Sequence, residues 1–344
     1  MKEKKWGKNE KKGLLWGALV SLVLLGILSG WLYEKILGNI DRIDEDHIDY
    51  LDPEEQDQFE EPDLPEEGGD AGPILPEDGV IWPEVPMLEA EDVTKVLLVG
   101  TDVWKEESRG RADAIMLATF SERTGALSLI SFQRDTYVRI PGYRDNRINT
   151  AYAFGGTKLL KEVLELNFGV TVDGVVVIDF TRFQQLIDAL GGVEIELTQR
   201  EAEHLRKQGA QVTEGMNHLN GEWALAYSRI RKIDSDFRRT DRQRKVLIAL
   251  FQAYRDLPRS QVPGMLEVVL PMVSTDLRDG QILRYATKVM LSGQETVHSR
   301  SIPFAGVYEN ATIRGMQVLM ADLEACNRAL AYFLHGQEYL GEED

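Results

Sequence analysis

The pattern of apolar and charged positions separates an N-terminal membrane-type segment from the rest of the chain. Residues 13–33 form a run of 21 residues without a charged side chain. At about 1.5 Å per helical residue, this run is long enough to cross the hydrocarbon core of a bilayer. Trp16, Trp31 and Tyr33 lie near its ends, as interfacial aromatic side chains do. We expect a transmembrane helix over residues 13–36 and not a cleaved signal peptide, because no small-residue cleavage site follows.

From residue 93 onward, stretches with the pattern of strands alternate with stretches that have the pattern of helices. Short apolar runs predict strands at residues 95–100, 114–120, 126–132, 174–179 and 193–197. Apolar positions three and four apart predict helices at residues 158–166, 182–190, 221–227, 240–255, 279–290 and 322–334. The run 174–179 is almost entirely Val and Ile, which is typical of a strand buried on both faces.

These elements predict an α/β fold over residues 93–337. We expect a layered domain in which a central mixed β-sheet is flanked by helices, preceded by the transmembrane helix and a disordered acidic linker. The chain has one cysteine, Cys326, so neither an intramolecular disulfide nor a zinc cluster can form. Because Cys326 lies in an apolar helical stretch, we expect a buried core thiol.

The net charge of −18 argues at face value against a protein that binds nucleic acid, which needs a basic face. The charge is, however, very unevenly distributed. Residues 1–12 hold six Lys and two Glu, whereas residues 41–92 hold 21 Asp and Glu against one Arg. By the positive-inside rule, the basic tail 1–12 stays in the cytoplasm, and everything after residue 36 lies outside the cell membrane.

The acidic stretch separates the predicted membrane span from the predicted domain. Residues 37–92 are rich in Asp, Glu, Pro and Gly, and such a segment cannot bury enough apolar surface to offset its ordering entropy. We expect an extended linker, with Trp82 and Val85 marking where the chain begins to dock. The domain over residues 93–337 is close to neutral, and residues 338–344 form a short acidic tail.

Several common catalytic signatures are absent from the sequence. There is no G-x-S-x-G, H-E-x-x-H, Walker or G-x-G-x-x-G motif, and the five His residues are scattered without ligand spacing. Hydrolase triads and zinc catalysis are therefore unsupported.

Arginine is concentrated in residues 228–245, which hold six Arg and two Lys. A solvated basic face is the ordinary explanation of such a run. Here, however, Arg239, Arg242 and Gln243 fall on or beside the apolar stripe of the helix that follows. Arg244 is expected to point away from that stripe. Inward-facing arginines at a helix N-terminus need an anion, because an unpaired buried charge is very costly.

Two further arginines extend this predicted anion site. Arg229 and Arg231 are two residues apart, so in an extended segment they share one face. Arginine binds phosphate oxygens through two donors at once, which makes phosphate the anion that these side chains suit best.

Carboxylates follow the predicted strands at two places. Asp102 comes directly after strand 95–100, and Asp113 leads into strand 114–120. An antiparallel pairing of these strands would bring the two together, and two carboxylates plus substrate phosphates commonly hold Mg²⁺. Alternatively, Asp102 and Asp113 are loop residues whose carboxylates only cap the local backbone.

A third group lies at the end of strand 126–132. Arg134 would be a further phosphate ligand. Asp135, next to it, either orients an arginine or acts as a base.

Seven motifs, in order, resemble the LytR-CpsA-Psr family of cell-wall glycopolymer phosphotransferases. They are VLLVGTD, GRADAIML, SFQRDTYVRIPG, RINTAYAFGG, IDFTRFQQLIDALGGVEIEL, HLNGEWALAYSRIR and DFRRTDRQRKVL, within a motif core over residues 95–256. The chain departs from the family pattern at Gln133, where Pro is usual, and at Arg238, where Gly is usual.

The resemblance implies transfer of a glycopolymer phosphate from a polyprenyl-pyrophosphate carrier to a peptidoglycan hydroxyl, as in the attachment of teichoic acid or capsule to the wall. It implies Mg²⁺ as cofactor, with Mn²⁺ as an alternative, and a pyrophosphatase side activity. The partners would be the lipid-linked glycopolymer, the peptidoglycan acceptor and the membrane, without nucleic acid. An alternative is a protein that binds polyprenyl phosphate or wall polymer without chemistry. A transcription regulator is opposed by the predicted topology, which puts the domain across the membrane from DNA.

The resemblance also assigns residues. The metal ligands would be Asp102 and Asp113. The pyrophosphate would be held by Arg111, Arg134, Arg229, Arg231, Arg239 and Gln243, to which the periodicity adds Arg242. The catalytic candidates are Asp102, Asp113, Arg134, Asp135 and Arg239. The family's apolar tunnel for the lipid would be lined by Phe180, Phe183, Leu186, Ile187, Leu190 and Leu250, although core packing explains each of these equally well.

Overall fold

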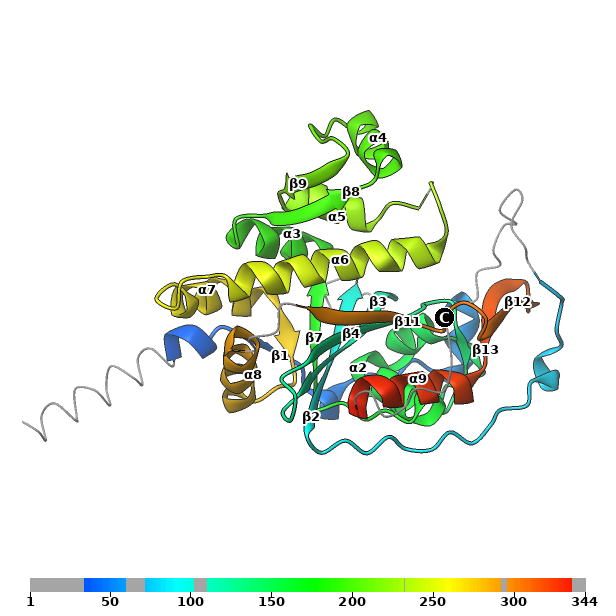
Figure 1. The fold of residues 1–344 in the computed structure, drawn as a ribbon. Coiled ribbons are helices and arrows are strands. Elements are labelled where there is room, and N and C mark those ends of the chain that lie inside the picture. Colours follow the sequence, from blue (N-terminus) through cyan, green and yellow to red (C-terminus); the bar gives the residue numbers. More distant parts are fainter. Residues whose placement is uncertain (1–33, 60–71, 102–109, 232, 292–295, 336–344) are drawn as a thin grey trace, which may run out of the picture.

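A mixed β-sheet forms the centre of the molecule (Figure 1). The structure is a computed structural model that describes residues 34–59, 72–101, 110–231, 233–291 and 296–335. Within these residues, the sheet has seven strands in the order β1-β10-β7-β2-β3-β4-β11. Their bounds are β1 Asp41–Arg42, β10 Ser274–Thr275, β7 Gly174–Asp179, β2 Val93–Thr101, β3 Ala112–Ser121, β4 Leu127–Phe132 and β11 Val297–Ile302.

The predicted mixed sheet flanked by helices is confirmed. β3 runs antiparallel to both β2 and β4, whereas β2 is parallel to β7 and β4 is parallel to β11. Figure 1 shows helices α2 (Ile148–Phe168) and α9 (Leu323–His335) on one face of the sheet and α6 (Asp236–Arg255) on the other. Apolar strand residues such as Leu97, Val99 and Leu117 are 0–1% exposed and pack in the core with α2 and α9.

A second apolar core lies on the outer side of α6. It is built from α3 (Phe180–Ala189), β8 (Val193–Leu197), α4 (Gln199–Lys207), β9 (Gly215–Leu219) and α5 (Gly221–Ser228). The strand predicted at residues 193–197 exists as β8, but it pairs with β9 in a separate hairpin and is not part of the central sheet. α5 approaches α3 closely, because a Cβ at Gly221 would lie 2.2 Å from the backbone O of Gln184.

Further elements lie around the edges of the sheet. They are β5 (Tyr137–Val138), β6 (Asn146–Arg147), α7 (Val262–Val269), η4 (Leu270–Met272), α8 (Asp279–Leu291), β12 (Tyr308–Ile313) and β13 (Met316–Ala321). Helix α2 begins ten residues before its predicted start, because it continues across a kink at Gly155 and Gly156. At Gly156 the φ angle of 59° is one that glycine adopts without strain.

The prediction of a disordered linker is wrong for the described part of residues 37–92. Residues 34–59, which we call the N-terminal strap, lie along the domain, and β1 within the strap pairs with β10 of the central sheet. Further along, Leu51 is 1% exposed. Its N–H donates to the carbonyl of Phe154 (2.7 Å), and its own carbonyl accepts from the Tyr143 hydroxyl (2.6 Å).

Residues 72–92 also dock on the domain. The Trp82 Nε1 donates to Asp145 at 2.7 Å, and the Trp82 ring stacks on Tyr137. Val85 packs against the main core as well, so Trp82 and Val85 dock as predicted. They do not mark where docking begins, because the strap already packs on the domain from Ile36 and Leu37 onward. An acid-rich composition shows that a segment cannot fold alone. The acidic segment is nevertheless ordered here, because a few of its apolar side chains pack against the core of the folded domain.

The described residues contain no helix that could cross a membrane by its length and apolarity. Of the predicted span over residues 13–36, residues 13–33 lie outside the described residues, as do the tails 1–12 and 338–344. Ile36, at the end of the predicted span, is buried against the domain instead. Residues 34–37 are helical, and Leu37 packs on the domain. Cys326 is fully buried as predicted, and burial raises the pKa of its thiol to about 12.

Candidate functional site

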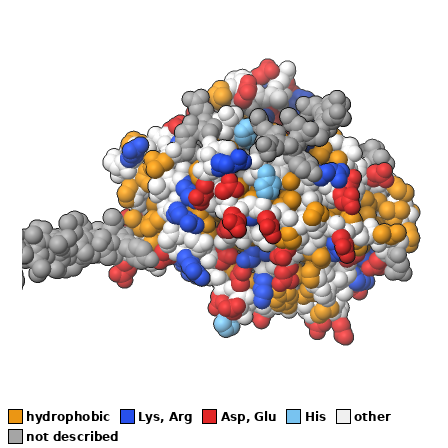
Figure 2. Space-filling model, turned by 60° about the horizontal axis from the view of Figure 1, so that its bottom comes forward, with side chains coloured by type: hydrophobic (Ala, Val, Ile, Leu, Met, Phe, Trp, Pro, Cys, Tyr) orange, Lys and Arg blue, Asp and Glu red, His pale blue; other side chains and the backbone are white. Residues whose placement is uncertain are grey.

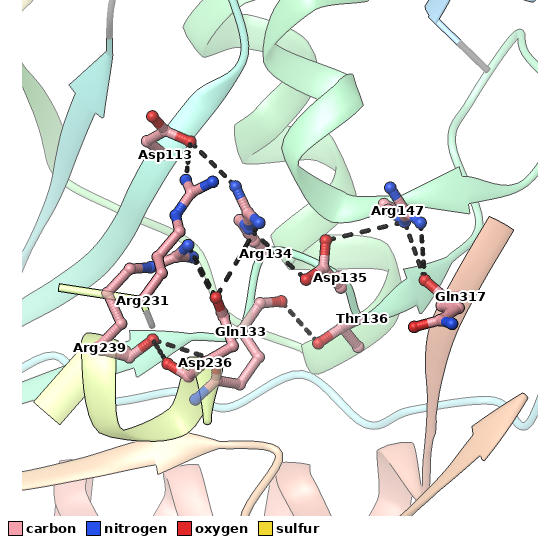
Figure 3. A network of polar contacts seen from close by, with 11 residues as sticks. Asp113, Gln133, Arg134, Asp135, Thr136, Arg147, Arg231, Asp236, Arg239 and Gln317 are labelled. Carbon is pink, nitrogen blue, oxygen red and sulfur yellow. Dashed lines mark hydrogen bonds and ion pairs between the residues drawn. The ribbon is translucent and has the colours of Figure 1, made fainter. Parts of the chain in front are cut away.

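Seven charged side chains from five separate segments meet at one end of the central sheet (Figure 3). They are Asp113 at the start of β3, Arg134 and Asp135 after β4, Arg147 at the end of β6, Arg231 after α5, and Asp236 and Arg239 in the first turns of α6. We call this group the anion cluster. With four arginines against three aspartates, it has an excess of one positive charge.

Asp113 lies where β3 begins beside the end of β2. The predicted antiparallel pairing is confirmed, since Gly100 pairs with Ala114 and Thr101 pairs with Ala112 across a register shift. Asp102, the predicted second carboxylate, lies outside the described residues. The Asp113 Oδ1 accepts from Arg134 Nη1 at 3.2 Å and lies 3.9 Å from Arg231 Nη2.

Arg134 lies in the middle of the anion cluster. Besides Asp113, its guanidinium contacts Asp135 at 3.5 Å and Asp236 at 4.0 Å. Burial by itself would lower the pKa of Arg134, but the three carboxylates outweigh it and hold this pKa above its ordinary value. Arg134 therefore remains a fixed positive charge.

Arg239 is the most deeply buried arginine of the anion cluster, with a side chain that is 3% exposed. Its Nη1 and Nη2 contact the Asp236 carboxylate at 2.7 and 2.9 Å, whereas its Nε has no hydrogen-bond partner among the described residues. Burial lowers the pKa of Arg239 to about 10, and the nearby charges of Arg134 and Arg231 contribute to this. A bound anion would relieve both the repulsion and the unpaired Nε–H.

Asp135 lies between two arginines. Its Oδ2 faces Arg134, and its Oδ1 lies 3.7 Å from Arg147 Nε. Its backbone carbonyl accepts from the N–H of Leu319 in β13, which fixes the segment after β4. Burial raises the pKa of Asp135, although Arg134 opposes this effect. A carboxylate with a raised pKa in such a position suits a proton acceptor.

Gln133 connects the strand end that carries Arg134 with the helix that carries Arg239. Its side chain is buried, donates to Ser301 Oγ at 3.1 Å and accepts from Thr240 Oγ1 at 3.1 Å. Its backbone N–H donates to the carbonyl of Ile302 at 2.8 Å, a bond that proline could not make. The departure from the family pattern at this position was visible in the sequence, but its structural role was not.

The prediction that Arg244 points away from the buried side of its helix is wrong. Arg244 is 7% exposed; it donates to Ser301 Oγ at 2.6 Å and pairs with Asp241. The reason is that α6 is covered on two sides, by the sheet through β4 and β11 and by the second core, so a single apolar stripe does not describe it. Arg238, the other departure from the family pattern, is 70% exposed and lies 3.7 Å from Asp241.

Arg242 is also buried, but the structure does not bring it into the anion cluster. Its Nη1 and Nη2 donate to the Asp234 carboxylate at 2.8 Å each, its Nη2 donates to the Ile230 carbonyl at 2.6 Å, and its Nη1 lies 3.4 Å from Glu201. This arginine is therefore already neutralised within the second core.

The remaining predicted phosphate ligands are close in sequence to members of the anion cluster: Arg111 precedes Asp113, Arg229 precedes Arg231, and Gln243 follows Arg239. The Arg111 Nη2 donates to the carbonyl of Phe59, the last residue of the strap, at 2.6 Å. The Arg229 guanidinium lies over the ring of Phe180, 4.5 Å from its centroid. Gln243 is half-buried one turn after Arg239 on α6.

The structure brings most of the predicted lipid-contacting residues together in the second core. Leu186, Ile187 and Leu250 are buried there, and Phe183 and Leu190 pack against them. Phe180 instead lies beneath Arg229, two residues from Arg231 of the anion cluster.

Asp113 is the described carboxylate that was predicted to bind a divalent cation. Among the described residues, no three His, Cys, Asp or Glu side chains form a metal-binding group. Mg²⁺, however, commonly takes only one or two carboxylates in addition to substrate phosphates. Within the described part of the chain, Asp113 contacts Arg134 and Arg231 through its Oδ1, so its Oδ2 can still bind a cation.

Comparison with known proteins gives a consistent set of relatives. A sequence model described as the LytR_cpsA_psr family matches residues 73–330. The regulatory protein MsrR of Staphylococcus aureus is 32% identical over 224 residues, which cover 62% of this chain and 66% of MsrR, just under two thirds of its length. The polyisoprenyl-teichoic acid–peptidoglycan teichoic acid transferase TagU of Halalkalibacterium halodurans is 35% identical over 196 residues, 56% of this chain and 63% of TagU.

Solved structures agree with this result. The structure of TagT bound to LIIa-WTA matches with a TM-score of 0.60 and 26% identity, and the match covers 73% of this chain and 92% of that one. TagT is a protein of Bacillus subtilis.

Proposed function

Because this chain belongs to the LytR-CpsA-Psr family, we propose that it is a Mg²⁺-dependent phosphotransferase of the cell wall. It moves a glycopolymer phosphate from a polyprenyl-pyrophosphate carrier to a hydroxyl of peptidoglycan. The observation that carries this proposal is the anion cluster, in which the buried Arg239 has an Nε–H without a hydrogen-bond partner in the described residues. The names of TagU, and of TagT with its bound LIIa-WTA, support the substrate class.

In the proposed reaction, the acceptor oxygen forms a bond to the phosphorus that carries the glycan. The bond between this phosphorus and the oxygen of the polyprenyl phosphate breaks, and polyprenyl phosphate leaves. Arg134, Arg231 and Arg239 bind the phosphate oxygens and stabilise the charge of the transition state. Asp135, held between Arg134 and Arg147, takes the proton of the acceptor hydroxyl.

Asp113, together with Asp102, would hold the Mg²⁺ ion, and Mn²⁺ could take its place. The bound ion would neutralise negative charge on the pyrophosphate oxygens. Arg111, Arg229 and Gln243 would complete the pyrophosphate site from its margins, whereas Arg242 is left out because Asp234 and Glu201 already neutralise it. Water in place of the acceptor hydroxyl would give the pyrophosphatase side activity.

The proposed location is the cell membrane, with the uncharged run over residues 13–33 as anchor, the N-terminus in the cytoplasm and the catalytic domain outside. Nucleic acid is not among the proposed partners. On the face shown in Figure 2, the basic side chains of the described residues are interspersed with acidic ones and form no continuous patch, which supports this choice.

The test supplies the purified full chain with a polyprenyl-pyrophosphate-linked glycan, Mg²⁺ and a peptidoglycan oligomer. Polyprenyl phosphate and the glycan-modified peptidoglycan should appear together, with any excess of polyprenyl phosphate coming from the side reaction with water, and a chelator should stop the formation of both. Asp113→Asn should give neither product. Lipid binding without any metal-dependent product would overturn the proposal in favour of a protein that only binds the polymer.

A further inference from the structure

The start of the N-terminal strap lies directly against helix α7. The Lys35 Nζ pairs with the Glu267 carboxylate of α7 at 2.9 Å. Ile36 and Leu37 are buried together with Leu270, and Leu266 of α7 packs against the same cluster. The contact between the strap and α7 is thus both ionic and apolar.

This contact lies at the point where the chain is predicted to leave the membrane. The uncharged run of 21 residues ends at Tyr33, and Lys35 is only two residues further on. Two helical residues advance the chain by about 3 Å, so a partner of Lys35 cannot be far from the bilayer surface. If residues 13–33 span the bilayer, α7 must lie next to its interface.

The composition of α7 fits this position. The helix has the sequence VPGMLEVV, and none of its residues is fully buried. Its single charged side chain, Glu267, is paired with Lys35 of the strap. Val268 is 46% exposed, and a Cβ at Gly264 would meet open space. An exposed helix with an apolar surface and a neutralised charge is suited to the interface between headgroups and acyl chains.

The strap prevents the domain from turning freely on its anchor. β1 pairs with β10, and Arg42 pairs with Asp279 of α8. Further along, Lys161 of α2 lies 2.7 Å from Glu45 of the strap and 3.0 Å from Asp276. The strap is thus bound to the domain at several places, and the orientation set by α7 is transmitted to the whole domain.

We propose that α7 is a membrane-contact helix, which lies with its Gly264, Met265 and Val268 surface in the interface of the bilayer that holds the anchor. The apolar surface of α7 continues inward, because Val269 and Met272 pack in the second core with Phe183 and Leu190. A lipid tail leaving the bilayer would therefore meet apolar side chains. The proposal rests on the predicted membrane span and does not depend on the transfer reaction.

The test places a fluorescent depth probe on the full-length chain. Cys326 is fully buried, so an introduced surface cysteine can be labelled selectively. Val268→Cys is labelled with nitrobenzoxadiazole, and the chain is reconstituted in vesicles of phosphatidylcholine and phosphatidylglycerol. Lipids that carry a doxyl quencher near the headgroup should quench this label strongly.

Two matched controls report on apolar surface elsewhere. Ile81→Cys and Met216→Cys replace apolar residues that are 94% and 66% exposed. The segment around Ile81 and the hairpin with Met216 lie on other sides of the molecule than α7 in Figure 1. Quenching at position 268 should exceed that at both controls several-fold.

Equal quenching at the three positions would overturn the proposal, as would quenching that is strongest at either control. All three positions are exposed, so the labelled chains should fold, and their unfolding temperatures verify this. Because no turnover is measured, the outcome is independent of whether the chain has transferase activity.

Discussion

Arg239 and Arg242 are three residues apart on α6 and are both buried, yet their guanidinium groups have opposite surroundings. Arg239 shares one carboxylate, Asp236, and is close to two other arginines. Arg242 is bound by two carboxylates and a carbonyl. The first arrangement has an excess of positive charge and can accept an anion, whereas the second is already neutral.

Replacing Arg239 should therefore affect activity and spare the fold. In Arg239→Gln we expect the rate of polyprenyl phosphate release to fall by about 10²–10³-fold, as when one charge-stabilising donor of an active site is lost. The unfolding temperature should change little, because a repulsive buried charge is removed together with its pairing to Asp236. A variant that turns over normally would exclude Arg239 from the phosphate site.

Replacing Arg242 should have the reverse effect. Arg242→Gln leaves Asp234 and the buried Glu201 without the positive charge that neutralises them, and we expect a loss of about 3–5 kcal/mol in the free energy of unfolding. Denaturant titration measures this loss. Since Arg242 lies outside the anion cluster, the fraction that remains folded should keep its specific activity. If Arg242→Gln is as stable as the original chain but less active, Arg242 binds the phosphate after all.

Asp135 should set the acid side of the pH profile. Burial raises its pKa above the ordinary value of 3.8, and only the deprotonated carboxylate can accept a proton. We therefore expect kcat/KM to rise with pH through a midpoint that lies above 3.8. Asp135→Glu should keep this acid limb at a lower rate, whereas Asp135→Asn should lose activity at every pH. If Asp135→Asn has an unchanged pH profile of kcat/KM, Asp135 is not the proton acceptor and only orients the neighbouring arginines.

At the scale of elements, the end of α2 is defined by Gly169. This residue caps the helix in the left-handed conformation, with φ of 70°. A Cβ at Gly169 would lie 2.1 Å from the backbone O of Pro86, in the docked segment before β2. Gly125, in the turn between β3 and β4, has nearly the same φ of 72° with nothing within 4 Å.

The two glycines make a matched pair of alanine substitutions. Gly125→Ala should cost about 1–2 kcal/mol, which is the cost of a left-handed conformation with a Cβ. Gly169→Ala should cost clearly more, because the backbone of Pro86 must also move away. Thermal unfolding of both variants measures the difference. Equal losses of stability in the two variants would show that residues 72–92 do not pack tightly against the end of α2.

At the scale of the whole molecule, the strap makes the domain larger than the region matched by the family. That match begins at residue 73, whereas the packed chain begins near residue 34. Acidic residues of the strap are used in pairs with the domain, as in Glu45 with Lys161 and Asp57 with Arg144. The high negative charge of this region is therefore partly neutralised by docking.

Leu51 tests whether the strap is part of the folded core. Leu51→Ala should lower the free energy of unfolding by about 2–5 kcal/mol, as for a fully buried leucine. Leu166→Ala on α2 is the control, since Leu166 is 38% exposed and should lose much less. If both variants unfold at the same temperature, the strap does not contribute to the stability of the domain.

The sequence by itself determined the alternation of strands and helices and the residue types of the site, because local spacing decides which side chains share a face. It also indicated the antiparallel pairing that places Asp113 at the end of the sheet, and the docking near Trp82. Only the tertiary structure decided which buried arginine is neutralised by carboxylates, why Arg244 is buried, and that an acidic segment is packed. These outcomes depend on partners far away in the chain. Arg242 meets Glu201, Gln133 meets Ser301, and Glu45 meets Lys161 only after the helices have packed on the sheet.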